Sequence, residues 1–350
     1  MAQINKPSLH FNTVLYTGTG SSNAITGVGF QPDFVWIKKR NGSTQHALFD
    51  ALRGTGKYLE SSSTAPDQTD NNSLSAFGTD GFTVISKNSV NTNSDTYVSW
   101  NWKAANSSGS ANNDGATAST VSANTTSGFS IVRWTGTGSA TTIGHGLGAV
   151  PGTYLVKNLS TNSLNWRVYH HQCAGQPAHK HLALESTQAL GDAASVFNDT
   201  EPTSTVFSVG TDDGANKSGD NMIAYVFAEK KGFSKFGRYI GNADGNGPYA
   251  YTGFKPAFLL IKNTVGTENW YLYDNKRGGP VAGYYGNLNK YFLQANTSNT
   301  ESNESLDIYF NGFKPKITNA FLNGNGNTIV YWAFAENPLI GTNNINATAR

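Results

Sequence analysis

The apolar pattern along the chain is organised around one ten-residue stretch that occurs three times. Each copy has Gly first, Pro fourth, an apolar run and Lys tenth: GFQPDFVWIK (29–38), GAVPGTYLVK (148–157) and GFKPAFLLIK (253–262). The run is too short for a helix and too apolar for a loop, so it predicts a strand after a Gly–Pro turn. Alternation places Phe34 and Trp36, with Lys38, on one face and Val35 and Ile37 on the other. Both faces are largely apolar, which predicts an interior strand of a β-sandwich.

The same order of shorter blocks surrounds each copy of this key strand. An aromatic residue and a Gly turn precede it, and a second apolar strand, a short third block and a closing aromatic strand follow it. The second strands are HALFD (46–50), NWRVYH (165–170) and NWYLYD (269–274), and the third blocks are YLES (58–61), ALES (183–186) and FLQA (292–295). The key strands lie 119 and 105 residues apart. This period is the size of a whole β-sandwich and too long for a propeller blade.

We therefore predict an all-β protein of three tandem β-sandwich domains, jelly-roll or lectin-like in type. Their expected bounds are 11–105, 128–231 and 233–338. Residues 106–127 contain one large apolar residue, Val121, and are interpreted as a flexible linker that lets the first domain move. Only residues 230–232 separate the other two units, so we expect those to be rigidly coupled. The polar tail, 339–350, is expected to be mobile.

The composition supports an all-β fold and argues against several classes of function. Apolar residues make up 37% of the 350, charged residues 14%, and there are 38 glycines, a mixture suited to short strands and turns. The net charge is +2 and no basic patch stands out, so we expect no nucleic-acid partner. No apolar run could span a membrane and Met1–His10 lacks a signal-peptide core, which predicts a soluble protein made in a cytoplasm, without membrane insertion. One cysteine excludes an internal disulfide, so stability must come from core burial and association with other chains.

One cluster has residue types that bind zinc. It consists of His170, His171, Cys173, His179 and His181. Only the second unit has this cluster, whereas a metal required by a shared fold should recur in all three. We therefore predict no metal and no cofactor, with the histidines in a solvated loop where they titrate near neutral pH. The alternative is a zinc site in the second unit alone, with the Cys173 thiolate and two imidazoles.

The corresponding positions of the other two units share an Asp-x-x-Arg-Gly pattern that begins at Asp50 and Asp274. A local ion pair that closes a turn after a strand is the favoured interpretation. Glycoside cleavage would need two carboxylates with separated pKa values. The repeat offers one Asp and an acid at 60 and 185 that Gln294 replaces in the third unit. We therefore predict no catalytic residues.

Aromatic residues at repeated, alternating positions are predicted to fill the core. Four tyrosines are not repeated and stand in Gly-rich loops: Tyr249, Tyr251, Tyr284 and Tyr285. We expect these to be ligand-facing surface residues, because aromatic rings stack on sugars and anchor protein partners.

The third unit resembles a known family in its longer motifs. These motifs are GNGPYAYTGFKPAFLLIKNT (245–264), NGFKPK (311–316), IVYWAFAENPL (329–339) and the junction FAEKKGFSKFGRYIGN (227–242). They resemble a tandem-repeat family found in virion proteins of tailed bacteriophages, many from marine and cyanobacterial hosts and often labelled tail-fibre or structural proteins. The resemblance covers residues 11–339. The first unit departs from it most, since it ends in NWKAAN where the others have FAE.

The resemblance implies a virion protein assembled in the host cytoplasm. The expected function is non-enzymatic, as a tail fibre or tail-tip component that contacts host-surface glycans or other virion proteins. A homo-oligomer is expected, with a trimer favoured, because phage parts are normally symmetric oligomers. Two alternatives stay open: a capsid decoration protein whose three units imitate a trimer, and a polysaccharide depolymerase.

Overall fold

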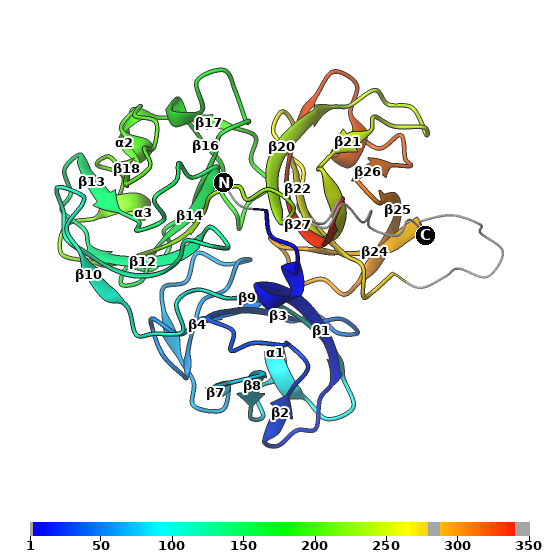
Figure 1. Cartoon of the computed structure of the whole chain (residues 1–350), viewed down its shortest axis with the longest axis horizontal. Coiled ribbons are helices and arrows are strands. Elements are labelled where there is room, and N and C mark those ends of the chain that lie inside the picture. The colour runs from blue at the N-terminus through cyan, green and yellow to red at the C-terminus, as the bar shows by residue number, and fades with distance from the viewer. Residues whose placement is uncertain (1–2, 279–287, 340–350) are drawn as a thin grey trace.

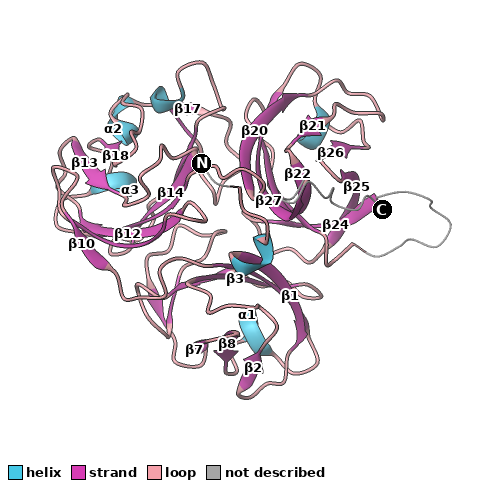
Figure 2. Ribbon diagram, in the orientation of Figure 1, coloured by secondary structure: helices cyan, strands magenta, loops and turns pink. Residues whose placement is uncertain are grey.

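Strands joined by turns make up almost all of this computed structural model, which describes residues 3–278 and 288–339 (Figure 2). The helices are single turns: α1 (Asn88–Asn91), α2 (Ala194–Phe197), α3 (Asp213–Asn216), α4 (Ala320–Asn323) and the 3-10 turns Pro7–Leu9 and Pro177–His179. The all-β prediction is confirmed. The described part of the chain has no helix with the length and apolarity to cross a lipid bilayer.

Each repeat builds the same four-stranded antiparallel arrangement, in which the closing strand lies between the first strand and the key strand. In the first repeat the order is β1 (Phe11–Thr17), β9 (Thr96–Trp102), β3 (Phe34–Lys39) and β4 (Ala47–Asp50). In the second it is β12 (Phe129–Thr135), β19 (Asn221–Phe227), β14 (Thr153–Asn158) and β15 (Arg167–His170). In the third it is β20 (Ser234–Ile240), β27 (Thr328–Pro338), β22 (Phe254–Asn263) and β23 (Trp270–Asp274).

Shorter strands form the outer parts of each repeat. The first repeat adds β2 (Asn23–Ile25), β8 (Gly81–Val84) and β7 (Leu74–Gly78) as one sheet and β5 (Lys57–Tyr58) with β6 (Gln68–Thr69) as another. The second adds β13 (Thr141–Gly144) with β18 (Val206–Val209) and β16 (Lys180–His181) with β17 (Gly191–Asp192). In the third, β24 (Leu288–Gln294), β25 (Ser302–Tyr309), β26 (Gly312–Pro315) and β21 (Ala250–Tyr251) extend the main sheet to eight strands.

The key strand is interior on both faces, as its alternation predicts. Phe34 and Trp36 of β3 pack into a central hydrophobic cluster, and Val35 and Ile37 pack into a separate cluster inside the first repeat. Residues of β14 and β22 divide between a central and an outer cluster in the same way. Each main sheet therefore lies between a core of its own repeat and a core that all three repeats share.

The shared core holds the three repeats around one centre, where Figure 1 shows them as three lobes. Aromatic rings from different repeats meet there. The ring centroids of Phe34 and Tyr225 are 4.2 Å apart, and Phe11 lies 5.3 Å from Phe334. Such close aromatic contact adds to the large apolar area that each ring buries. The repeats are thus joined by core packing as well as by the chain.

The segment interpreted as a flexible linker is ordered structure instead. Residues 106–127 contain β10 (Ser110–Asn112) and β11 (Ser119–Asn124), and β11 pairs with β12 with Val121 opposite Val132. Ladder hydrogen bonds come from the backbone, so a strand of small polar residues can extend a sheet that already exists. At the other junction, Ile4 N donates to Lys231 O over 3.1 Å. Of the expected mobile tail, residues 340–350 lie outside the described residues.

Candidate functional site

The lysine that ends each key strand reaches across a boundary between repeats. All three lysines are fully buried. Their ammonium groups donate to backbone carbonyls of the preceding repeat: Lys38 Nζ to Ser298 O at 3.2 Å, Lys157 Nζ to Thr64 O at 3.0 Å and Lys262 Nζ to Thr187 O at 3.0 Å. Each also donates to a carbonyl of its own repeat. The first repeat contacts the third, the second contacts the first and the third contacts the second, so the contacts close a ring.

Burial changes the chemistry of these amines. It lowers the pKa of Lys38 to about 7 and those of Lys157 and Lys262 to about 8, because the charged form is poorly solvated there. Among the described residues, no carboxylate forms an ion pair with any of the three. Their role is therefore to satisfy buried carbonyls at the seams between repeats.

The Asp-x-x-Arg pattern forms a buried ion pair at the same seams. Asp50 Oδ2 lies 2.5 Å from Arg53 Nε, and both side chains are almost fully buried. Tyr225 of the second repeat donates its hydroxyl proton to the same carboxylate oxygen over 2.8 Å. Arg53 also pairs with Asp67 at 2.7 Å. The local ion pair expected from the sequence is present, but it lies in the interior.

The third repeat has the same arrangement. Asp274 Oδ2 lies 2.6 Å from Arg277 Nε and accepts a 3.0 Å hydrogen bond from Trp100 Nε1 of the first repeat. Arg277 also lies over the Trp100 ring. Because these carboxylates are enclosed and already bonded, a polymeric substrate cannot reach them.

In the second repeat, His170 and Cys173 stand where the other repeats have Asp and Arg. Both are buried, and His170 Nε2 donates to Tyr331 O of the third repeat over 3.3 Å. Burial lowers the pKa of His170 to about 3 and raises that of the Cys173 thiol to about 12. Both groups are therefore neutral at pH 7. The expectation of histidines in a solvated loop is wrong for His170, because the seam encloses it.

The other three histidines do not converge on this pair. His171 Nε2 lies 2.6 Å from Phe236 O, and His179 Nδ1 lies 3.5 Å from Asp199 Oδ2. His181 belongs to β16, while His179 ends the preceding 3-10 turn, so the two do not share a strand face. Nowhere in residues 3–278 and 288–339 do three or more His, Cys, Asp or Glu side chains gather as metal ligands would. That the fold requires no metal stays a prediction for elemental analysis.

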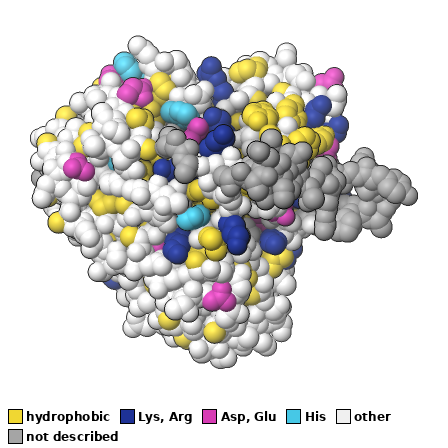
Figure 3. All heavy atoms as spheres, viewed as in Figure 1, with side chains coloured by type: hydrophobic (Ala, Val, Ile, Leu, Met, Phe, Trp, Pro, Cys, Tyr) yellow, Lys and Arg dark blue, Asp and Glu magenta, His cyan; other side chains and the backbone are white. Residues whose placement is uncertain are grey.

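Two of the four tyrosines expected at the surface are exposed. Tyr249 and Tyr251 keep 44% and 56% of their area exposed. Phe310, close to the strand β26 that pairs with β21, keeps 40%. The rings of Tyr249 and Tyr309 meet at 5.6 Å. Figure 3 shows hydrophobic side chains gathered over the lobe of the third repeat. Tyr284 and Tyr285 lie outside the described residues.

All three repeats line one polar depression of about 510 Å³. Its lining residues are Thr64, Asn165, Glu185, Ser186, Thr187, Gln188, Asn269, Asn296 and Thr297. Burial raises the pKa of Glu185, whose Oε2 accepts a 3.0 Å hydrogen bond from Trp166 N. Among these lining residues Glu185 is the one carboxylate, whereas glycoside hydrolysis by the usual routes needs two. The depression can therefore bind polar groups more readily than it can cleave a glycosidic bond.

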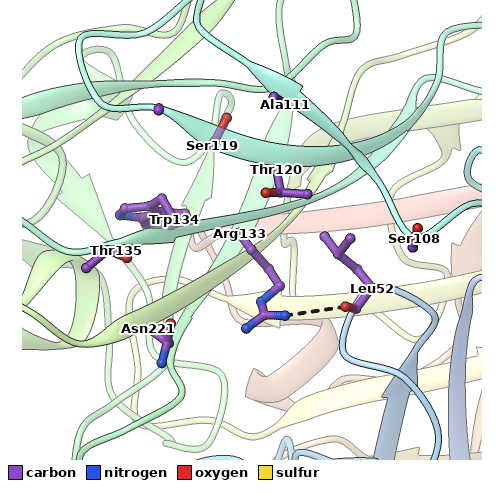
Figure 4. Close-up of a pocket in the computed structure, with 10 residues that line it drawn as sticks. Leu52, Ser108, Ala111, Ser119, Thr120, Arg133, Trp134, Thr135 and Asn221 are labelled. Carbon is purple, nitrogen blue, oxygen red and sulfur yellow. Dashed lines mark hydrogen bonds between the residues drawn. The ribbon is translucent and has the colours of Figure 1, made fainter.

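A second pocket, of about 450 Å³, opens between the first and second repeats. Figure 4 shows Arg133 extending across it, with Leu52 on one side and Thr135 and Asn221 on the other. The sequence does not predict a role for Arg133, because the hairpin of β10 and β11 that forms part of this pocket is interpreted there as a linker. One feature of the sequence could have indicated this site. Arg133 is a cation on a first strand, and its partner on the closing strand β19 is Ile223, which is not acidic.

Comparison with known proteins yields a family but no function. No curated protein matches the chain, and no solved structure matches it. Residues 6–338 match a family described as a domain of unknown function, DUF7483. That match spans all three repeats and both junctions between them, so this chain belongs to the DUF7483 family.

Proposed function

We propose that the chain is a non-enzymatic structural protein of a bacteriophage virion, most simply a tail fibre or tail-tip component that contributes to host attachment or tail assembly. The observation that carries the proposal is the closed ring of buried contacts between the repeats. Breaking a buried, hydrogen-bonded contact leaves unsatisfied groups at considerable cost, so the ring favours one rigid body. A rigid, strand-rich particle suits a part exposed outside a cell, and the sequence resemblance to virion proteins supports the same role.

Host attachment would involve the exposed aromatic residues of the third repeat. Tyr249, Tyr251 and Phe310 offer ring faces to solvent, and the Tyr249 hydroxyl bonds to the Asn311 side chain. Rings held in this way can stack on the apolar faces of sugars while nearby amides bond to sugar hydroxyls. A host-surface glycan is therefore the proposed partner of this surface.

Other virion proteins, and further copies of the chain, are the remaining proposed partners. The homotrimer expected from phage symmetry stays part of this proposal. Sedimentation of the purified chain measures it directly, since a trimer has three times the mass of the monomer. A monomer at micromolar concentration would remove the trimer from the proposal and leave the attachment role standing.

Capsid decoration is the second candidate, and one observation favours it. Three similar repeats around one centre give a single chain an approximate threefold shape (Figure 1), which could occupy a site of threefold symmetry on a capsid. The depolymerase alternative lacks accessible catalytic acids at Asp50 and Asp274, because both carboxylates are buried in ion pairs.

Location in the virion tests the proposal. Gold-labelled antibodies against the chain should mark the tail of intact particles in electron micrographs. Label on capsid facets with a bare tail would replace the tail role by decoration, and particles without label would reject both. In a separate test, a Tyr249→Ser, Tyr251→Ser variant should adhere less to host cells, whereas Leu9→Ser, at another exposed apolar residue, should adhere normally.

A further inference from the structure

The pocket beside Arg133 is built by a hairpin that the other repeats lack. In the first and third repeats the main sheet begins with β1 and β20, which are edge strands. In the second repeat β10 and β11 add two strands outside β12 and supply half of the pocket wall. Since the first and third repeats form their main sheets without such a hairpin, the fold of a repeat does not require it.

Arg133 lies where one face of β12 leaves the central core. Ile131, two residues earlier on the same face, is part of the central cluster, while Arg133 is half-buried at the pocket floor. Its cross-strand neighbour on β11 is Thr120. Arg133 Nη1 donates to Leu52 O over a long 3.4 Å, and the rest of the guanidinium forms no hydrogen bond within the described residues.

This guanidinium lacks the counter-ion that most arginines of the chain have. Arg40, Arg53, Arg167 and Arg277 each pair with a carboxylate. No Asp or Glu of residues 3–278 and 288–339 forms an ion pair with Arg133, and none lines the pocket. A planar group with free donors in a partly enclosed site attracts a carboxylate, which it can bind through two hydrogen bonds.

The walls select a polar ligand and are already in place. Ser108, Thr120, Thr135 and Asn221 present hydroxyl and amide groups. Trp134 also lines the pocket, but it belongs to the outer cluster of the second repeat and is only 4% exposed. Gly109 has a φ of +90°, and a Cβ there would lie 2.6 Å from Leu52 Cδ1. The hairpin therefore packs directly on the first repeat, and the pocket offers no open aromatic face for a nucleobase.

We propose that this pocket binds an acidic sugar residue of a glycan. The sugar carboxylate pairs with Arg133, and the ring hydroxyls bond to Thr120, Thr135 and Asn221. The proposal rests on the proposed function of glycan attachment and names the class of sugar. It places a second contact on the second repeat, distinct from the aromatic surface of the third.

Calorimetric titration of the full chain tests this site with two matched probes. The first is trigalacturonic acid and the second is the same trisaccharide with its carboxylates reduced to alcohols. Only the acidic form should bind, and Arg133→Gln should weaken its binding about ten- to a hundred-fold, as expected for loss of a charged hydrogen-bonded pair. Arg238→Gln is the control, because Arg238 holds the equivalent position on β20, is exposed and has no hairpin beside it.

Three outcomes would overturn the inference. They are no binding of the acidic trisaccharide, equal weakening by both substitutions, and equal displacement by inorganic phosphate at the same concentration, which would indicate a general anion site. Circular dichroism of both variants shows whether the fold is retained. If the protein is located on the tail but does not bind the acidic trisaccharide through Arg133, the acidic-sugar site alone is refuted. If the protein is absent from virions but binds the acidic trisaccharide through Arg133, the virion role alone is refuted.

Discussion

At the scale of single residues, the seams between repeats contain ionisable side chains that are buried away from water. Three solutions appear in one molecule. Asp50 and Asp274 are neutralised by arginines, and His170 with Cys173 achieves the same fit with uncharged groups. The three key-strand lysines follow a third solution, in which carbonyl oxygens alone surround an ammonium.

The lysines predict that stability rises with pH above neutrality. Their folded pKa values of about 7 to 8 lie below the ordinary 10.5, so between these limits the unfolded chain binds more protons. The free energy of unfolding should therefore increase from pH 7 towards pH 9, by up to about 3 kcal/mol per lysine over the whole window. Above about pH 10 the trend reverses, because burial raises the pKa of tyrosines such as Tyr225.

Urea denaturation at a series of pH values measures this slope. Lys157→Met should reduce the slope by about a third, whatever its effect on absolute stability. Lys231→Met, at an exposed lysine, should leave it unchanged. An identical slope in wild type and Lys157→Met would show that Lys157 does not titrate in this range.

The buried ion pair gives a second prediction. Asp274→Ala leaves the Arg277 guanidinium and Trp100 Nε1 without their shared acceptor, which should cost about 3–5 kcal/mol of unfolding free energy. Asp192→Ala removes a largely exposed partner of Lys180, so it should lower the unfolding free energy far less than Asp274→Ala does. Similar small losses in both variants would mean that the Asp274 pair is not enclosed as described.

At the scale of the element, the key strands carry apolar side chains into two cores at once. Ile261 of β22 is fully buried in the outer cluster of the third repeat. Ile261→Asp places an unpaired carboxylate there, at a cost of several kcal/mol that can exceed the whole stability of a domain. The variant should be insoluble or unfolded by circular dichroism. Val265→Asp, just beyond the same strand and 57% exposed, should melt like the wild type.

At the scale of the whole molecule, the shared core makes the repeats depend on one another. A fragment of residues 11–105 would expose Phe34, Trp36 and Trp102, which lie in the central cluster. We expect this fragment to aggregate and the full chain to unfold in one cooperative transition, with calorimetric and van't Hoff enthalpies that agree.

Limited proteolysis checks the same point from the other side. Because β10 and β11 are paired in a sheet, cleavage within 106–127 should not be the first event. Early release of an intact, soluble first repeat would show that the interpretation as a linker is correct after all. Two resolved transitions in calorimetry would support the same conclusion.

The sequence by itself determined the first, key, second and closing strands of each repeat, their order and the burial of the key strands. Alternation of apolar side chains is a local property, so it predicts β3 as interior and places Phe34 and Val35 on opposite faces. Repetition of the pattern predicts three similar sheets, and repeated aromatic residues do fill the core. The exposure of Tyr249 and Tyr251 followed from their place in Gly-rich turns.

Only the tertiary structure decided how the repeats meet. The lysine contacts at the seams join residues 260, 93 and 75 positions apart, and their acceptors are backbone carbonyls. Every residue carries such a carbonyl, so nothing in the side-chain pattern marks which one a lysine will reach. For the same reason a run of small polar residues became β11, because an existing sheet edge supplied the backbone partners, and the Arg133 pocket exists only through that pairing.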